Sequence, residues 1–249
     1  MKNKVIKFMT QEIKLIDEHG LRLDKRKLED LRPIIAKAGV LKNAEGSGFF
    51  AFGNTQAIAS VYGPKEVYPR FMEEPERAII KTVYAMAPFS TTERNKPGPS
   101  RRTIEISFVI RQALEPVLFL EEFPKTMINI YIEVMQADAS TRCAAINAAS
   151  IALADAGIPM RDLVASCSVG KVNSQIVLDV AGKEDEQGDV DLPVAYYSRK
   201  KQITLLQMDG IITKDEFKRA VDLAINGCEQ IYEKQKQALR TRYEEVEFE

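Results

Sequence analysis

Residues 136–159 read QADASTRCAAINAASIALADAGIP, and this stretch decides the fold. Its alanine-rich run predicts a helix over 140–156, because alanine is the strongest helix former. Gly157 and Pro159 end the helix in the expected way, with glycine after the last turn and proline beyond it. So many small side chains also predict that the helix is tightly packed against its neighbours.

The segments on either side alternate between strand and helix patterns. Apolar spacing indicates further helices at about 100–120 and 214–243. Strands are expected at 40–42, 48–52, 57–62, 78–86, 126–136, 163–171, 175–181, 190–198 and 202–208. This order indicates an α+β or α/β sandwich with helices packed on mixed sheets, and the class predicted here is α+β. The short linkers favour a single domain over 1–249, in which 1–20 form an N-terminal arm.

Two predicted helix starts carry arginine where the helix field disfavours it. One reads SRR (100–102) and the other STR (140–142), whereas the helix start TKDE (213–216) is a capping box with acids in its first turn. A helix N-terminus is partly positive, so each cation there costs about 0.3–1 kcal/mol. The arginines fit either pairing with nearby surface acids or a bound anion, most commonly phosphate.

The segment EDEQGDVD (184–191) holds five acids in eight residues. Like charges this dense raise the pKa of an uncompensated carboxyl group. A sharp turn at Gly188 would bring Asp185 and Asp191 together. The spacing fits either a solvated hairpin loop or a Mg²⁺ site, because Mg²⁺ takes one or two carboxylates with phosphate oxygens and water. A carboxylate pair opposite an anion-binding helix start suits phosphoryl transfer.

The composition excludes several classes of protein. The net charge of −1 over 249 residues gives no global basic field, so nucleic acid would need a local basic patch. The three cysteines have neither metal-site nor disulfide spacing, which indicates a reducing cytoplasm. The single histidine, His19, lies in a turn-like context and argues against Ser-His-Asp catalysis. Neither a signal peptide nor a membrane-spanning run is apparent.

Arg70 lies between aromatic residues in a predicted loop over 65–77. A cation among aromatic rings is typical of a stacking platform for single-stranded bases. An ordinary exposed loop explains the same residues, and the sequence pattern alone favours that alternative.

Several motifs, in order along the chain, resemble the RNase PH family of phosphorolytic exoribonucleases. They are GSGFFAFGNTQAIASVYGPKE (46–66), PSRR (99–102), QADASTR (136–142), ADAGIPMRDL (154–163) and the pair Asp185 and Asp191. The resemblance extends from about Leu21 to the last helix and is strongest to the catalytic ring subunit of the archaeal exosome. It implies an RNase PH-like fold, similar to the second domain of ribosomal protein S5.

The resemblance also implies a reaction and an assembly. Inorganic phosphate would attack the last phosphodiester of single-stranded RNA, from 3′ to 5′, and release a nucleoside diphosphate. The cofactor would be Mg²⁺, or alternatively Mn²⁺. Three copies would alternate with three copies of a related non-catalytic subunit in a hexameric ring, to which RNA-binding cap subunits attach.

The same resemblance implies roles for individual residues. Asp185 matches the catalytic acid, and Asp191 matches the second carboxylate at the metal. The phosphate site would be formed by Ser140, Thr141, Arg142 and Arg102, and the RNA would be held by Arg70, Arg101 and Arg102. Whether Asp185 is a general acid or only a metal ligand stays open.

The chain departs from the family pattern at three places. The family's usual Gly-Ser-Arg phosphate segment is Ser140-Thr141-Arg142 here, so side chains replace the expected glycine. Lys25 stands in place of the glycine of an Asp-Gly-Arg motif. Pro193 occupies a position where some bacterial relatives carry a lysine, so that lysine contact is absent.

Two other functions remain compatible with these residues. One is a homohexameric RNase PH that trims the 3′ ends of transfer RNA. The other is a non-catalytic ring subunit that only binds RNA, although such subunits lose the carboxylates or the phosphate segment, which this chain retains.

Overall fold

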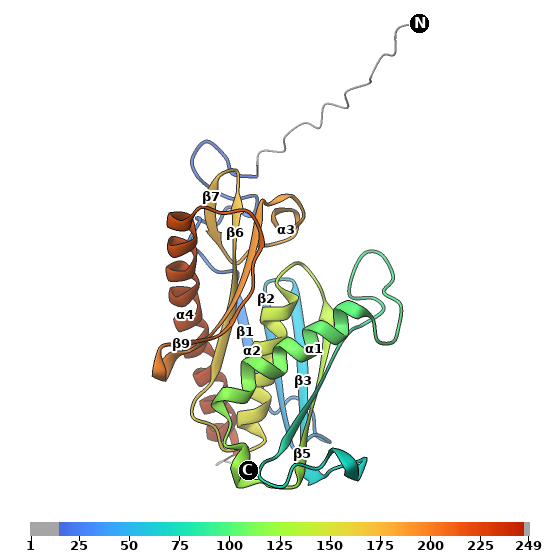
Figure 1. The fold of residues 1–249 in the computed structure, drawn as a ribbon. Coiled ribbons are helices and arrows are strands. Elements are labelled where there is room, and N and C mark those ends of the chain that lie inside the picture. Colours follow the sequence, from blue (N-terminus) through green and yellow to red (C-terminus); the bar gives the residue numbers. More distant parts are fainter. Residues whose placement is uncertain (1–14, 247–249) are drawn as a thin grey trace, which may run out of the picture.

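The residues described in this computed structural model, 15–246, form two five-stranded sheets and four α-helices (Figure 1). The predicted α+β class, with mixed sheets and packed helices, is therefore confirmed. Four short 3₁₀ helices lie at Arg70–Met72, Glu115–Val117, Leu120–Glu122 and Ser198–Lys200.

The first sheet is built from the N-terminal half of the chain. In spatial order its strands are β1 (Ile34–Ala38), β2 (Gly46–Phe52), β3 (Thr55–Glu66), β5 (Thr126–Gln136) and β4 (Ile79–Met86). Only β4 and β5 are parallel, and the other neighbours are antiparallel. A parallel pair requires a crossover connection, and here the crossover contains the first helix.

Helix α1 (Arg101–Leu114) forms that crossover, and α2 (Thr141–Asp155) follows β5. Both helices cover one face of the first sheet (Figure 1). Because β4 and β5 are parallel, the two arginine-bearing helix starts that follow them lie on the same side of the molecule.

The second sheet is entirely antiparallel and completes the C-terminal half. Its strands are β6 (Val164–Val172), β7 (Gln175–Leu178), β8 (Val190–Tyr197), β9 (Gln202–Leu206) and β10 (Asp209–Gly210). The short helix α3 (Lys183–Gln187) joins β7 to β8, and the long helix α4 (Lys214–Val246) packs against β6 and β1. The predicted capping box at Thr213 and Glu216 is present, with reciprocal hydrogen bonds at the start of α4.

Helix α2 is buried between the two sheets. Every residue from Cys143 to Leu153 is buried, and the helix contacts both β2 and β6. Each buried isoleucine or leucine contributes about 1.5–3 kcal/mol relative to an exposed one. The approach to β2 is close enough that a Cβ atom at Gly48 would lie 2.3 Å from the carbonyl oxygen of Ala148. Only glycine fits there without a shift of the helix.

Two predictions are wrong, and others differ only in their bounds: the helix expected at about 100–120 ends at Leu114, and the strand expected at 175–181 ends at Leu178. The strand expected at 40–42 is wrong, and the strand lies instead at Ile34–Ala38, because Gly39 takes a left-handed backbone (φ 68°) that ends it. The hairpin-loop interpretation of 184–191 is also wrong, because this segment begins within α3 and ends in β8.

Gly188 has a different role from the one that the sequence suggested. Its backbone is extended (φ −70°), so it does not form a left-handed turn. A Cβ atom at this position would lie 2.5 Å from the carbonyl oxygen of Glu184. Glycine is therefore required by the close approach of the chain to the end of α3.

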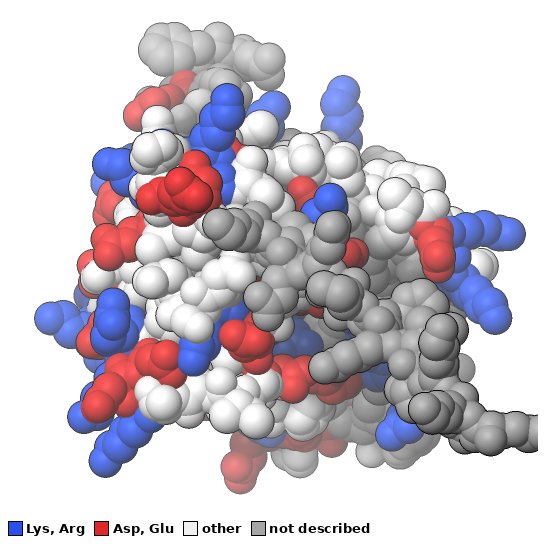
Figure 2. Space-filling model, turned by 90° about the horizontal axis from the view of Figure 1, so that it is seen from above, with Lys and Arg blue, Asp and Glu red and all other residues white. Residues whose placement is uncertain are grey.

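Part of the predicted N-terminal arm (1–20) lies outside the described residues, which begin at Leu15. The single-domain organisation stays a prediction, although one hydrophobic core includes buried residues of both sheets. Acidic and basic side chains are interspersed on the end of the molecule shown in Figure 2, consistent with the near-zero net charge. No helix in the described part of the chain is long and apolar enough to cross a membrane.

We predict that Gly48→Ala destabilises the fold by about 1–3 kcal/mol, the usual range for overpacking, since the added methyl group meets the backbone of α2. Urea unfolding measures the change in free energy. Lys37→Ala, at an exposed position of the neighbouring strand β1, is the control and should change stability by less than about 0.5 kcal/mol. Equal stability of Gly48→Ala and the wild type would show that α2 is not held this closely.

Candidate active site

A pocket of about 460 Å³ lies where the start of α2, the start of α1, α3 and β8 meet. Its lining includes every residue predicted for phosphate or metal binding, namely Arg102, Ser140, Thr141, Arg142, Asp185 and Asp191. Residues from four separate elements thus converge on one cavity. Arg101 and Arg70 do not line it.

The start of α2 presents uncapped backbone N–H groups. Ser140 is the N-cap residue, but its side chain does not cap the helix. Its hydroxyl group instead donates to the carbonyl oxygen of Val180 (2.9 Å) and lies 2.7 Å from Ser168 Oγ. The first N–H groups of a helix have no intrahelical acceptor, so an anion is the natural partner at this end.

Arg142 extends from the first turn of α2 into the pocket. One of its terminal nitrogens donates to Gln207 Oε1, and the other lies 3.8 Å from Glu105 Oε1. Its Nε is buried and has no hydrogen-bond partner among the described residues. An unpaired buried donor is costly, so Arg142 retains bonding capacity that an anion would satisfy.

Helix α1 begins in a capping box, in which Ser100 accepts from the backbone of Thr103 and Thr103 reaches back to Ser100. The cap satisfies this helix end without an anion and leaves Arg101 and Arg102 exposed. Neither arginine forms an ion pair with a residue that the structure describes, so the alternative pairing with surface acids is not seen for them. Of the two, only Arg102 reaches the pocket.

The two predicted carboxylates approach the pocket from different elements. Asp185 lies in α3, and Asp191 lies in β8 opposite Asp209 of β10. Partial burial, followed by repulsion from Asp185 and Asp209, raises the pKa of Asp191 to about 6. The pKa of Asp185 is also raised, chiefly by desolvation, although this residue keeps an exposed surface and Arg102 partly offsets the rise. Both carboxyl groups therefore bear an unfavourable charge that a cation would relieve.

No group of three or more His, Cys, Asp or Glu side chains in the described part of the chain is arranged to hold a metal ion. Two carboxylates nevertheless fit the requirement of Mg²⁺, which completes its coordination with phosphate oxygens and water. The mutual repulsion of Asp185 and Asp191 is consistent with such a shared cation.

Sequence reasoning missed several polar residues that line the pocket. They are Thr91, Asn95, Asp138, Ser168 and Glu186. Ser168 lies in β6, directly opposite Pro193 of β8, and nothing in the local sequence marks it as part of a site. Thr91 and Asn95 belong to the irregular segment before α1, where the basic residues give a clear sequence signal and single amides and hydroxyls give none.

Arg70 begins a short 3₁₀ helix and is exposed, between the highly exposed rings of Tyr68 (85%) and Phe71 (87%). This arrangement agrees with both earlier alternatives, a stacking platform and an ordinary loop. His19 is exposed in a turn and does not line the pocket, as expected of a histidine without a catalytic role.

Comparison with known proteins agrees with this geometry. Sequence profiles of the 3′ exoribonuclease family match in two parts, domain 1 over residues 30–159 and domain 2 over 162–227. The exosome complex component Rrp41 of Pyrococcus furiosus is 59% identical over 231 residues, which cover 93% of this chain and 92% of that protein. Rrp41 of Methanopyrus kandleri is 53% identical over 92% of this chain and 96% of its own length.

Solved structures show the same fold. Rice Rrp46 aligns with a TM-score of 0.80 at 24% identity and covers 88% of this chain and 100% of its own. A chain of the Archaeoglobus fulgidus exosome, solved with RNA bound to the active site, aligns with a TM-score of 0.76 at 23% identity over 87% of this chain and 93% of its own. Together with the profile matches and the close relatives, this confirms the predicted resemblance: the chain belongs to the 3′ exoribonuclease, or RNase PH, family.

Proposed function

We propose that this chain is the catalytic ring subunit of an archaeal exosome, a phosphate-dependent 3′→5′ exoribonuclease that releases nucleoside diphosphates from single-stranded RNA. The observation that carries the proposal is the single pocket in which an uncapped helix start and Arg142 face two carboxylates of raised pKa. The close relatives named as exosome components support the assignment.

The attacking phosphate would bind at the start of α2. The backbone N–H groups there, together with Arg142 and Arg102, supply the positive charge that orients it. Arg101 and Arg102 would hold the 3′ end of the RNA. Positioning of this kind supplies most of the catalysis in phosphoryl transfer, because the protein forms no covalent bond with the transferred group.

Asp185 and Asp191 would hold Mg²⁺ or Mn²⁺, which when bound offsets charge at the scissile phosphate. The raised pKa of Asp185 also suits donation of a proton to the departing 3′-oxygen. Ligation and proton donation make different demands on the same carboxyl group, since only its ionised form binds a cation well.

The proposed assembly is a ring of three copies alternating with three copies of a related non-catalytic subunit, with RNA-binding caps and with Arg70 lining the channel. A cytoplasmic location agrees with the three cysteines, all of which are buried and free. Weighing the purified chain alone tests the homohexameric alternative. Turnover only after addition of the second subunit supports the proposed ring.

We predict that nucleoside diphosphate release from a 3′-tailed RNA requires phosphate and that Asp185→Asn lowers kcat about 100-fold or more. The matched control is Asp189→Asn, an exposed acid two residues from Asp191 that does not line the pocket. It should retain wild-type turnover. Persistence of activity without phosphate indicates hydrolysis, and binding of RNA without turnover indicates a non-catalytic subunit.

We predict that Arg142→Gln raises the KM for phosphate about 10- to 100-fold, since a charged hydrogen bond contributes about 1.5–3 kcal/mol. Arg101→Gln is the comparison, because Arg101 lies one residue outside the pocket lining. It should change the KM for RNA and leave that for phosphate within about twofold. Similar phosphate KM values for both variants would remove Arg142 from the phosphate site.

We predict a pH-dependent gain of stability in Asp191→Asn. In the folded protein Asp191 keeps its proton up to about pH 6, whereas the unfolded chain releases it near the ordinary pKa of 3.8. The folded state therefore binds more protons in this window, and its stability falls as the pH rises through it. The variant should exceed the wild type at pH 7, and the difference should shrink towards pH 4.

Urea unfolding in EDTA at several pH values measures this difference. The control, Asp189→Asn, makes the same substitution at an exposed acid outside the pocket and is measured at each pH alongside Asp191→Asn. A constant offset for Asp191→Asn would mean that its carboxyl group is not strained in the folded protein.

A further inference from the structure

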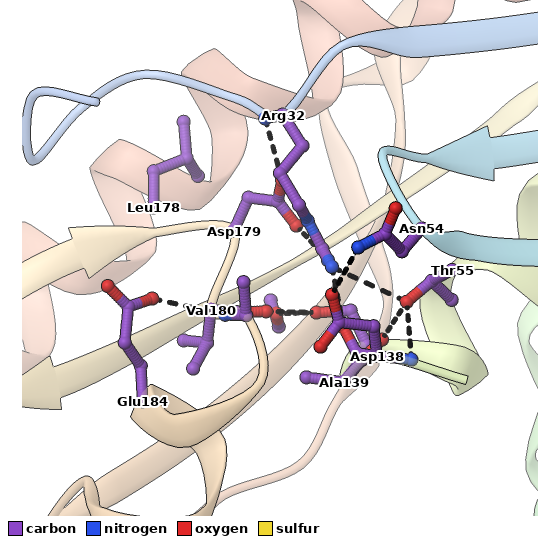
Figure 3. A network of polar contacts seen from close by, with 12 residues as sticks. Arg32, Asn54, Thr55, Asp138, Ala139, Leu178, Asp179, Val180 and Glu184 are labelled. Atoms are coloured by element: carbon purple, nitrogen blue, oxygen red, sulfur yellow. Dashed lines mark hydrogen bonds and ion pairs between the residues drawn. The ribbon is translucent and has the colours of Figure 1, made fainter. Parts of the chain in front are cut away.

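A buried polar network lies beside the pocket and uses residues to which the proposed chemistry assigns no role. It joins the irregular segment 22–32 to the loop 178–184, which leads into α3. Figure 3 shows the part of the network around Arg32 and Asp179. The bonds connect residues 147 to 162 positions apart in the sequence. Hydrogen bonds between residues so far apart in the sequence form only in the folded chain, where they hold two distant segments together.

The first part of the network is the ion pair of Arg22 and Glu184, whose side chains are 0% and 4% exposed. Arg22 Nε donates to Glu184 Oε1 at 2.8 Å, and a terminal nitrogen donates to the second oxygen. Arg22 also donates to the carbonyl oxygen of Asp179 (2.8 Å), and Glu184 accepts the N–H of Ala181 (3.1 Å). The pair therefore fixes the turn into α3 at the residue immediately before Asp185.

The second part is Arg32, whose guanidinium group donates two hydrogen bonds, of 2.6 and 2.9 Å, to the two carboxylate oxygens of Asp179. Another Arg32 nitrogen donates to the carbonyl oxygen of Asp138 at 2.6 Å. Asp138 lies two residues before Ser140, at the start of α2. Arg32 thus ties the loop that leads to the carboxylate to the loop that leads to the anion site (Figure 3).

Two hydroxyl groups add to these contacts: Thr55 holds residues 138 and 139 to the start of β3, and Ser140 joins the start of α2 to the loop 178–184. Thr55 Oγ1 donates to the carbonyl oxygen of Ala139 (2.7 Å) and accepts the N–H of Asp138 (3.0 Å). Ser140 Oγ donates to the carbonyl oxygen of Val180. Ala139 and Ser140 both have left-handed backbones (φ 62° and 55°), which non-glycine residues adopt only when their surroundings enforce it.

We propose that the pairs Arg22–Glu184 and Arg32–Asp179 are positioning residues of the active site, which hold Asp185 at a fixed distance from the start of α2. The inference rests on the proposed function. Helix α3 has only five residues, too few for a stable helix on its own, so its orientation depends on the anchor at Glu184. Arg22 positions Asp185 through Glu184. Arg32 positions both the carboxylate loop, through Asp179, and the start of α2, through Asp138.

A contribution to stability alone does not explain these contacts well, because a buried ion pair often adds little net stability over apolar residues of similar size. A buried ion pair does hold its two segments in one fixed geometry. Removing a group that is hydrogen-bonded to a metal ligand usually changes metal affinity or activity 10- to 100-fold. The Arg22–Glu184 pair acts on Asp185 through the backbone of the preceding residue, so we expect an effect at the lower end of this range.

The test replaces both charges of the first pair, with the double variant Arg22→Met and Glu184→Leu in the complete ring. Mn²⁺ is the probe, followed by electron paramagnetic resonance, and steady-state kinetics report kcat and the KM for phosphate. We expect kcat and Mn²⁺ affinity to fall at least tenfold, with the phosphate KM within about twofold. Arg32→Lys, which weakens the tie to Asp138, should also raise the phosphate KM.

The control is Lys236→Met with Glu233→Leu, which removes an exposed ion pair of α4 and should leave all three quantities unchanged. If the double variant does not fold, Glu184→Gln takes its place, with an expected loss of at least threefold in kcat and in Mn²⁺ affinity. The positioning role is overturned if kcat and Mn²⁺ affinity are unchanged. It is also overturned if the Arg22–Glu184 variant raises the phosphate KM by the same factor by which kcat falls. Absence of phosphate-dependent turnover in the wild type instead overturns the proposed function.

Discussion

The close packing of α2 between two sheets is the constraint on which the rest of the structure depends. The backbone of α2 lies so near β2 that Gly48 has no room for a side chain. Because the helix is buried on nearly all sides, it can neither rotate nor slide without opening the core. Its N-terminus, and with it Arg142, is thereby fixed at the pocket.

The pocket itself is electrostatically unfavourable in both of its halves. Positive groups gather at an uncapped helix start, and two carboxyl groups with raised pKa values face them. The opposite charges offset one another only in part, since Arg102 reverses part of the rise in the pKa of Asp185 while Arg142 bonds Gln207 and pairs with Glu105. Bound ligands of opposite charge stabilise such a site. Without them its unpaired charges lower the stability of the fold, as is common in active sites.

Much of this arrangement could be predicted from local sequence signals. The alanine run, the helix start at 140–142 and the acidic segment are each recognisable within about ten residues, and the structure brings them to one pocket. The route from Asp185 to Asp191 was not predictable, because Glu184 of the five-residue helix α3 is paired with Arg22, which is 162 positions away in the sequence. The same holds for Ser168 and for Arg32, whose partners are distant in the sequence and carry no local pattern.

The order of strands in the first sheet has a consequence for biogenesis. Strand β5 lies between β3 and β4, so the sheet cannot close until residue 136 has left the ribosome. The pocket needs β8 as well, which is made still later in translation. A nascent chain therefore leaves β3 and β4 without β5 between them until more than half of the chain has been made, a state prone to aggregation, and it completes the pocket only when nearly four-fifths of the chain exists.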